Sequence, residues 1–503
     1  MSRTGVFTFG ERNHMSNESW RPKLHLSPYS GSISDPNGLC QFKGTYHFFC
    51  QNAPTYPPNG DSPHGWGHFA SRDLVNWVFL GCHVMPDTPA DCDGSYSGGA
   101  YINDETDELW LYYTGNVRDG EGDGTTSGRL ANQTLMKSYN GINLGPKEVV
   151  LDNSGYPAYC SCHVRDPKVW KDETGFHMLL GARTLADSRG AIMMYDSEDG
   201  YTWTMAGSVT NPGEKPFGYM WECPDRIVLE GKEYLSTCPQ GMCSSNDPDD
   251  PDRVTVQNVH AAGYFPIEGS IVDLMHQDTE RMDAAAPRAA IDESTFIDWD
   301  YGFDYYACQS LVDEKGRTIL IGWMSLPHDA DDIRAYDNPT STWRGALTIP
   351  RVLSVCPKCG RVKQNPAEEF DALRGEAQAW SQSVTLPEKC ADVVIDGIEG
   401  EGVLSFGDFL TFTWKDGKAE LLFLDDEKGQ GRKGRRALIP KIKNIRVVVD
   451  TSILEIYVNN GGWVFSTRFF DEADELTITS TFASESAVWY PMDTVNVNYL
   501  VVR

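Results

Sequence analysis

The chain has 503 residues, of which 40% are hydrophobic and 11% aromatic, and its 72 acidic and 43 basic residues give a formal net charge of −29. This charge makes nucleic acid and anionic membrane surfaces poor partners and suits a small neutral ligand better. The length exceeds that of a usual single domain, so two domains are expected, and the aromatic content is typical of a β-rich protein.

Residues 1–20 contain several charged side chains and no apolar run of about 7–15 residues, so they predict no secretory signal. No later stretch reaches the roughly 18 apolar residues of a membrane helix. The 13 cysteines are odd in number and scattered, which fits a reducing compartment. We therefore expect a cytoplasmic protein, and the sequence leaves its oligomeric state open.

The first conspicuous segment is Ser34-Asp35-Pro36-Asn37-Gly38. Proline fixes the local backbone and Asn-Gly favours a tight turn, so the carboxylate of Asp35 is held in place. The same string is a good turn in its own right, and taken alone it predicts no more than a turn.

Short apolar or alternating runs follow, and helical periodicity is scarce. They predict strands at residues 45–50, 109–114, 176–181, 227–229 and 318–323. The segment Ser71-Arg72-Asp73-Leu74-Val75-Asn76-Trp77 recurs as Ser197-Glu198-Asp199-Gly200-Tyr201-Thr202-Trp203, with a fainter copy at residues 138–141. Such a repeated outer hairpin indicates four-stranded blades that close around an axis, which is a β-propeller.

Two further acidic segments, Arg165-Asp166-Pro167 and Glu222-Cys223-Pro224-Asp225, also hold carboxylates close to a proline. Splitting a glycosidic bond needs one carboxylate nucleophile and one carboxylic acid, often with a third acidic group on the sugar hydroxyls. Inner strands of separate blades could bring Asp35, Asp166 and Glu222 together at a central funnel. Adjacent residues on a strand face opposite ways, so an ion pair between Arg165 and Asp166 is not assumed.

The last third of the chain predicts a second domain. Residues 366–374 are the best helical candidate, so we expect a linker with a short helix at 356–375, after a propeller at 1–355. Short runs with turns between them predict a β-sandwich at 376–503, with strands at residues 403–406, 419–424, 445–449, 454–458 and 476–479. Residues 428–436, dense in Gly, Lys and Arg, are expected to form a mobile loop between strands.

Cys356-Pro357-Lys358-Cys359-Gly360 resembles half of a zinc knuckle. A structural zinc site needs four ligands, and the cysteines and histidine at residues 160–163 are spaced unlike the usual second half. We expect no metal and no cofactor.

The ordered set of motifs resembles the invertases and fructanases of glycoside hydrolase family 32. The further segments that carry the resemblance are Tyr46-His47-Phe48-Phe49-Cys50-Gln51, Trp66-Gly67-His68, Tyr96-Ser97-Gly98, Asp304-Tyr305-Tyr306-Ala307-Cys308-Gln309, Gly322-Trp323-Met324 and Trp343-Arg344-Gly345. The resemblance implies five blades, with Asp35 as nucleophile, Glu222 as acid and base, and Asp166 as the stabiliser of the transition state. Asp35 then has to be ionised while Glu222 is protonated, and clustered carboxylates favour such a split.

The resemblance also implies a set of sugar-binding residues. Amides and hydroxyls would bond the fructose hydroxyls, indole faces would cover the apolar ring edge, and Cys223 would help to tune Glu222. The set is Ser34, Asn37, Gln51, Trp66, Ser97, Arg165, Cys223, Tyr305 and Trp323, to which His163 could be added. Ser34 stands where the family usually has Asn, which leaves the exact substrate open.

The sequence therefore predicts a retaining β-fructofuranosidase that acts on a small-molecule sugar, either sucrose or short fructo-oligosaccharides. A sucrose-6-phosphate hydrolase and a fructosyltransferase are alternatives within the same chemistry. From another class, a propeller that binds sugar without catalysis is the competing interpretation, against which the three intact carboxylates argue.

Overall fold

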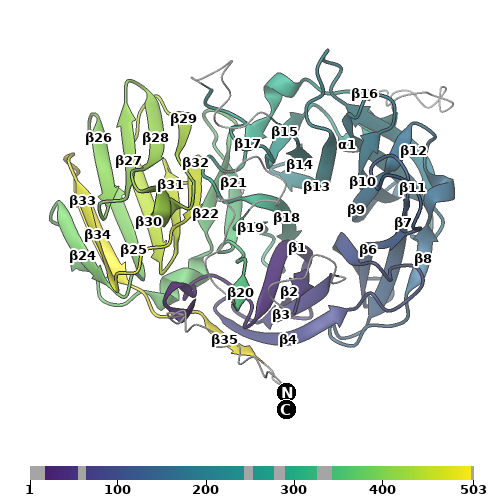
Figure 1. Cartoon of the computed structure of the whole chain (residues 1–503), viewed down its shortest axis with the longest axis horizontal. Coiled ribbons are helices and arrows are strands. Elements are labelled where there is room, and N and C mark those ends of the chain that lie inside the picture. The colour runs from purple at the N-terminus through teal and green to yellow at the C-terminus, as the bar shows by residue number, and fades with distance from the viewer. Residues whose placement is uncertain (1–16, 55–63, 243–252, 277–288, 326–341, 500–503) are drawn as a thin grey trace, which may run out of the picture.

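The computed structural model describes residues 17–54, 64–242, 253–276, 289–325 and 342–499. Five sheets stand in a ring, and two further sheets are stacked beside it (Figure 1). The all-β prediction of a five-bladed propeller followed by a sandwich is confirmed.

Each blade is built on an antiparallel meander. The first blade contains β1 (Gly31–Phe42), β2 (Thr45–Ala53), β3 (Gly65–Ser71) and β4 (Asn76–Val84). The second contains β5 (Ser95–Asn103), β6 (Glu108–Arg118), β7 (Arg129–Ser138) and β8 (Glu148–Leu151). The third contains β9 (Cys160–Asp172), β10 (Gly175–Thr184), β11 (Gly190–Ser197), β12 (Thr204–Thr210) and the short β16 (Ala289–Ala290). The fourth contains β13 (Met220–Leu229), β14 (Lys232–Gln240), β15 (Gly263–Ile267) and β17 (Ile297–Asp298). The fifth contains β18 (Tyr306–Val312), β19 (Thr318–Trp323), β21 (Arg351–Val355) and β22 (Val362–Pro366).

The innermost strands β1, β5, β9, β13 and β18 contact one another in a closed ring. The short strand β20 (Trp343–Arg344) pairs in parallel with β1 at Gly31 and Ser32. Gly345 follows with a φ of +80°, and a Cβ there would lie 2.0 Å from the carbonyl oxygen of Ile33. Only glycine tolerates both the left-handed backbone and this close approach. The motif Trp343-Arg344-Gly345 therefore belongs to the closure of the ring.

The repeated Ser-x-Asp segment makes the same turn in three blades, between the third strand and the outer strand. In the first blade, Ser71 Oγ accepts from Leu74 N and Asp73 Oδ1 accepts from Asn76 N. In the third, Ser197 Oγ and Asp199 Oδ1 accept from Gly200 N and Thr202 N. The faint copy in the second blade, Ser138 with Asn140, follows the same pattern. The repeat marks a turn that satisfies its own backbone N–H groups.

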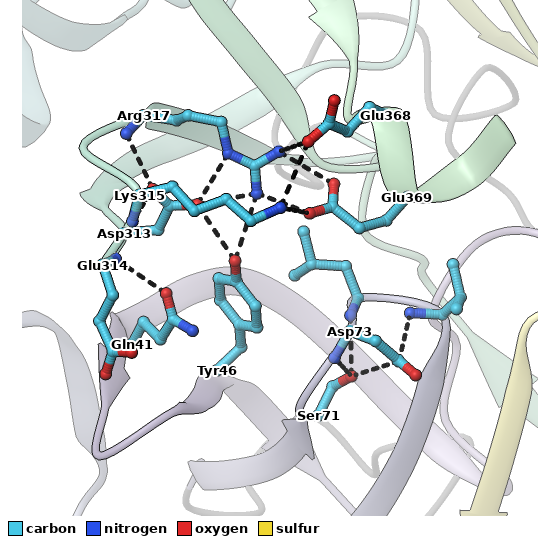
Figure 2. A network of polar contacts seen from close by, with 12 residues as sticks. Gln41, Tyr46, Ser71, Asp73, Asp313, Glu314, Lys315, Arg317, Glu368 and Glu369 are labelled. Atoms are coloured by element: carbon cyan, nitrogen blue, oxygen red, sulfur yellow. Dashed lines mark hydrogen bonds and ion pairs between the residues drawn. The ribbon is translucent and has the colours of Figure 1, made fainter. Parts of the chain in front are cut away.

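A polar network joins the first blade to the fifth (Figure 2). Tyr46 of β2 donates to Asp313 Oδ2 over 3.1 Å, and Arg317 bonds Asp313 Oδ2 over 2.8 Å and Glu369 Oε1 over 2.8 Å. Burial raises the pKa of Glu369, but hydrogen bonds from Arg317 and Lys315 outweigh it and lower this pKa to about 2. The network ties the junction where the ring closes to the 3₁₀ helix η5 (Glu368–Leu373).

Replacement of Arg317 by glutamine should destabilise the fold by about 2–4 kcal/mol, because it leaves the fully buried Asp313 and the largely buried Glu369 without their shared cation. Lys315→Gln is the matched control: its side chain is 55% exposed, so its loss should cost under about 1 kcal/mol. Urea unfolding followed by tryptophan fluorescence measures both. Equal midpoints for the two variants would contradict the role given to Arg317.

The two sheets of the sandwich face each other across a large apolar core. One contains β23 (Gln378–Ala379), β34 (Ser486–Pro491), β25 (Ala391–Asp396), β30 (Asn444–Asp450), β31 (Ile453–Val458) and β32 (Trp463–Arg468). The other contains β24 (Ser383–Pro387), β33 (Glu475–Ser480), β26 (Gly402–Phe406), β27 (Leu410–Lys415), β28 (Lys418–Phe423) and β29 (Gly434–Leu438). The described residues also form short helices: η1 (Asn17–Trp20), η2 (Asn153–Gly155), α1 (Ile271–His276), η4 (Glu293–Thr295) and α3 (Asp426–Gly429).

The structure departs from the expected domain boundaries at two places. β22 lies inside the expected linker at 356–375, yet it is the outer strand of the fifth blade. The final strand β35 (Asn496–Tyr499) lies inside the expected sandwich, yet it pairs in parallel with β4 of the first blade (Figure 1). β35 adds to a sheet edge that is far away in the sequence, which local patterns do not predict, whereas β22 forms a hairpin with β21.

The sequence predicts a mobile loop at residues 428–436, and the structure corrects this prediction. Arg432 and Arg435 are buried: Arg432 binds both carboxylate oxygens of Asp304, and Arg435 binds Asn258 Oδ1. Nearby, Arg351 of the fifth blade bonds Asp300 and Glu455. Arg432 and Arg435 therefore hold the sandwich against the propeller, because a buried guanidinium group needs hydrogen-bond acceptors around it.

Among the described residues, no helix is both long and apolar enough to cross a membrane. Residues 1–16, on which the prediction about secretion depends, lie outside the described part of the chain.

Candidate active site

The acidic motifs lie on inner strands, at places where the strand register shifts. Such shifts occur in β1 between Ile33 and Pro36, in β13 between Glu222 and Asp225, and in β18 between Tyr306 and Gln309. Asp166, Cys223 and Ala307 have φ values of +66°, +47° and +48°, in the left-handed region that non-glycine residues rarely adopt. A β-bulge re-aims the side chains beside it, so these irregularities decide which groups face the axis.

Asp35 is held by the neighbouring blade. Its Oδ2 accepts a hydrogen bond of 2.7 Å from Ser97 Oγ of β5. Burial and the charge of nearby Glu222 raise the pKa of Asp35 to about 6, although the Ser97 hydrogen bond and the charge of Arg165 act in the opposite direction. The carboxyl group is therefore close to its titration range at neutral pH.

Glu222 has a partner on each oxygen. Arg165 of β9 bonds Oε1 through Nε at 2.9 Å and through Nη2 at 2.5 Å, and Tyr306 of β18 bonds Oε2 at 2.6 Å. Arg165 thus points at Glu222. This agrees with the expectation from strand alternation that an ion pair between Arg165 and Asp166 is not to be assumed. Three blades fix the position of this one carboxyl group.

Tyr306 was not predicted as a site residue from the sequence, which instead predicts a sugar contact for its neighbour Tyr305. Tyr305 is buried in the core, lies against Gly322 and has the Arg351 guanidinium 4.9 Å from its ring centroid. The expected sugar contact of Tyr305 is therefore wrong for the described chain. Alternation places one of two adjacent tyrosines toward the axis, but the bulge that selects Tyr306 leaves no signal in the sequence.

Asp166 is 3% exposed and is tied to its neighbours by the backbone. Its N–H donates to Thr114 Oγ1 over 3.0 Å, and its Oδ2 accepts from Cys223 N over 2.9 Å. Burial raises the pKa of Asp166, with added repulsion from Glu222 and Asp35, against the opposing charge of Arg165. Cys223 is buried in a core cluster, and both its N–H and its thiol, the latter at 3.8 Å, donate to Asp166 Oδ2, so its expected sugar contact is corrected to contacts with Asp166.

The remaining predicted residues divide into two groups. Ser34 is partly exposed beside Asp35, and Trp323 is 8% exposed with an indole N–H that has no hydrogen-bond partner within the described structure. Trp66 is fully buried: it packs against Phe49 and Tyr113, and its N–H bonds Tyr96 O over 2.9 Å. The expected stacking of Trp66 on a sugar ring is therefore corrected to support of the strands beneath the site.

Gln51 and Asn37 are also largely buried and bond backbone. Gln51 donates to Ser95 O over 3.0 Å, whereas Asn37 Oδ1 accepts from Gly98 N over 3.2 Å. The Asn37 Nδ2 group is buried and has no partner in the part of the chain that the structure describes. These amides brace β1 and β5, the strands that carry Asp35 and Ser97.

The carboxyl groups of Asp35 and Glu222 differ in their surroundings. Glu222 accepts two hydrogen bonds on Oε1 and one on Oε2, whereas Asp35 accepts one from Ser97 and burial raises its pKa to about 6.

A basic cluster extends outward from Arg165. His163 Nδ1 accepts from Arg165 Nη1 over 2.8 Å, and its Nε2 donates to Gly124 O over 3.1 Å, so the ring is neutral with the proton on Nε2. Burial and the charges of Arg165, Arg129 and Arg183 lower the pKa of His163 to about 3. The Arg129 Nε group is buried and has no hydrogen-bond partner among the described residues. Three guanidinium groups thus lie within electrostatic reach of one neutral histidine.

The described residues contain no group of three or more His, Cys, Asp or Glu side chains arranged to hold a metal ion.

Two family models match the chain. The one described as "Glycosyl hydrolases family 32 N-terminal domain" matches residues 25–366, and the one described as "Glycosyl hydrolases family 32 C terminal" matches residues 416–498. A sucrose-6-phosphate hydrolase of Bacillus subtilis (strain 168) is 32% identical over 485 residues, which cover 93% of each chain. A raffinose invertase of Escherichia coli is 29% identical and covers 93% of this chain and 94% of its own.

Solved structures resemble the whole fold. A sucrose-6-phosphate hydrolase from Lactobacillus gasseri superimposes with a TM-score of 0.78 at 25% identity, covering 95% of this chain and 94% of its own. A GH32 beta-fructofuranosidase from Bombyx mori does so with a TM-score of 0.73 at 28% identity, covering 96% of each chain.

Proposed function

This chain belongs to glycoside hydrolase family 32, and from that premise we propose that it hydrolyses terminal β-fructofuranosyl residues of sucrose or short fructo-oligosaccharides with retention of configuration. The observation that most supports this is the meeting of Asp35, Asp166 and Glu222 from three inner strands. Each carboxyl group is held by a neighbouring blade. Glycoside hydrolysis with retention needs such a rigid pair of carboxyl groups, with a third to bind hydroxyls.

In the first step the ionised Asp35 attacks the anomeric carbon of the fructosyl unit, while Glu222 gives a proton to the leaving oxygen. The Ser97 hydroxyl orients the attacking carboxylate. Arg165 and Tyr306 orient Glu222 and stabilise the charge that remains after it has lost the proton. Asp166 binds fructose hydroxyls and stabilises positive charge that develops on the ring.

In the second step Glu222 takes a proton from water, which attacks the fructosyl-enzyme ester and frees Asp35. A second sugar in place of water would give transfer, so some fructosyl transfer is expected at high sucrose.

The experiment that tests the function is release of reducing sugar from a panel of sucrose, sucrose 6-phosphate, kestose and inulin. Binding of these sugars without any release would instead favour the non-catalytic propeller.

The acid limb of the kcat/KM profile should lie near pH 6, because the nucleophile has to be ionised and the pKa of Asp35 is raised to about 6. Activity therefore falls as the pH drops through this value. Ser97→Ala removes a hydrogen bond that favours the ionised form, so the limb should move to higher pH by about one unit. Ser97→Thr keeps a hydroxyl and serves as the control. An acid limb that stays in place in Ser97→Ala would mean that another group sets it.

A second candidate substrate, sucrose 6-phosphate, is favoured by the basic cluster. Glu222 protonates the leaving group, so the leaving sugar has to lie on the side of Arg165 and His163. Arg129 and Arg183 are within electrostatic reach of that histidine, and guanidinium groups suit phosphate oxygens. The sucrose-6-phosphate hydrolases among the relatives are consistent with this candidate.

Arg129→Gln should raise the KM for sucrose 6-phosphate by roughly 10- to 100-fold and change the KM for sucrose little, since one charge-assisted hydrogen bond contributes about 1.5–3 kcal/mol. Arg72→Gln, an exposed arginine on an outer turn of the first blade, is the matched control. Steady-state kinetics on both substrates measure the effect. An equal loss on the two substrates would exclude Arg129 from phosphate recognition.

A further inference from the structure

The hairpin between β21 and β22 brings two cysteines together on the outer side of the fifth blade. Cys356 N donates to Arg361 O over 2.8 Å, and Gly360 N donates to Cys356 O over 2.9 Å. Gly360 has a φ of +73°, which lets the chain turn back tightly. The Cys359 thiol and the backbone N–H groups of Lys358 and Cys359 all donate to the Cys356 sulfur. The tight turn therefore holds the two cysteines close together, and Cys356 is partly exposed while Cys359 is exposed.

The surroundings of this pair differ from those of the other cysteines. The hydrogen bond from Cys359 and those from the two backbone N–H groups, together with the charge of Lys363, lower the pKa of Cys356 to about 7. Burial raises the pKa of Cys82 to about 11 and of Cys160 to about 12. The exposed Cys92 also has a raised pKa, through its own partial burial and the charge of Asp93. Among the described cysteines, Cys356 is thus the thiol best suited to react as a thiolate.

A structural metal does not account for the pair. A closed thiolate site needs four ligands, and around this hairpin the described residues offer only the two sulfur atoms. Cys359 instead lines an open cavity of about 490 Å³ between the fourth blade and the sandwich, with Lys232, Tyr234, Arg361 and Trp463 on its wall. A small thiol or disulfide can therefore approach Cys359 from solvent, and Cys356 is itself partly exposed.

We propose that Cys356 and Cys359 form a redox-active dithiol that a small anionic disulfide converts into an intramolecular disulfide. The thiolate of Cys356 attacks one sulfur of the disulfide RSSR, forms a mixed disulfide and releases one RS⁻. The thiolate of Cys359 then attacks the Cys356 sulfur, closes the protein disulfide and releases the second RS⁻. The two cysteines lose two protons and two electrons, which reduce RSSR to two thiols.

Lys358, Arg361 and Lys363 give the hairpin a local positive charge in an otherwise acidic protein. An anionic disulfide should therefore react faster than a cationic one. The site lies on outer strands, away from the carboxylates on β1, β9 and β13, so its chemistry does not depend on the proposed hydrolase function.

The test uses the full chain, reduced and then equilibrated with oxidised glutathione at pH 7. Peptide mapping by mass spectrometry should find a disulfide between Cys356 and Cys359 while Cys92 remains a thiol. In the Cys359→Ser variant, Cys356 should keep one glutathione as a mixed disulfide. In the Cys356→Ser variant, the remaining Cys359 should react no faster than Cys92. Alkylation of Cys356 by iodoacetamide in the reduced chain should exceed that of Cys92 by roughly tenfold or more.

Cys92→Ser is the matched control and should leave disulfide formation unchanged. Oxidation by cystamine, which is cationic, should be slower than oxidation by glutathione disulfide. The proposal is overturned if excess glutathione disulfide leaves both thiols free, or if the chain takes up one equivalent of zinc that blocks oxidation. Because the readout is mass and alkylation rate, an inactive hydrolase would not affect the result.

Discussion

Replacement of Asp35 by asparagine should lower kcat by about 10⁴- to 10⁶-fold, the range seen when the nucleophile of a covalent mechanism is lost. Asparagine has the same shape and can still accept from Ser97, so the geometry of β1 and β5 should be preserved. What the variant lacks is the negative charge that forms the bond to the anomeric carbon. Single-turnover kinetics on sucrose measure the loss.

Asp199→Asn is the control for this variant. Asp199 caps a turn on the outer edge of the third blade, and asparagine can cap it equally well. Its kcat should equal that of the unmodified chain. Near-normal turnover in a folded Asp35→Asn protein would remove Asp35 from the proposed mechanism.

Glu222→Gln should lower kcat on sucrose by about 10²- to 10⁴-fold, because general acid catalysis contributes a factor of that size. Glutamine still accepts from Tyr306 and keeps the side chain in place, but it cannot release a proton to the leaving oxygen. A fructoside with an activated aryl leaving group needs no such proton. Its first step should therefore be affected far less, and its pH profile should lose the basic limb.

An equal loss on sucrose and on the activated fructoside would contradict the acid role. It would point instead to a general disturbance of the ion pair with Arg165. Thermal unfolding of Glu222→Gln separates the two possibilities, because a disturbed ion pair would also lower the melting temperature.

Much of this fold could be predicted from the sequence. Alternating apolar runs predict strands, and the Ser-x-Asp repeat marks the same self-satisfied turn in three blades. Sequence patterns fail where partners are distant along the chain. Arg432 looks like part of a solvated basic loop until Asp304, 128 residues away, is placed beside it.

In the candidate site, too, local motifs could be predicted from the sequence and contacts between distant segments could not. The carboxylates at residues 35, 166 and 222 are visible as motifs because each lies within two residues of a proline, and the structure brings them together. Which tyrosine reaches Glu222 depends on a bulge at Tyr306, and whether Trp66 faces a sugar or the core depends on packing from the next blade. Strand bulges and contacts between blades are set by tertiary structure, so motifs alone do not determine them.

The central claim, a double displacement through Asp35 with Glu222 as acid and base, is tested most directly by the configuration of the first-formed product. An NMR time course of sucrose hydrolysis, recorded before the fructose anomers equilibrate, gives that configuration. Two successive inversions at the anomeric carbon predict that β-fructofuranose appears first. Initial release of α-fructofuranose would mean a single displacement by water and would contradict the covalent role of Asp35.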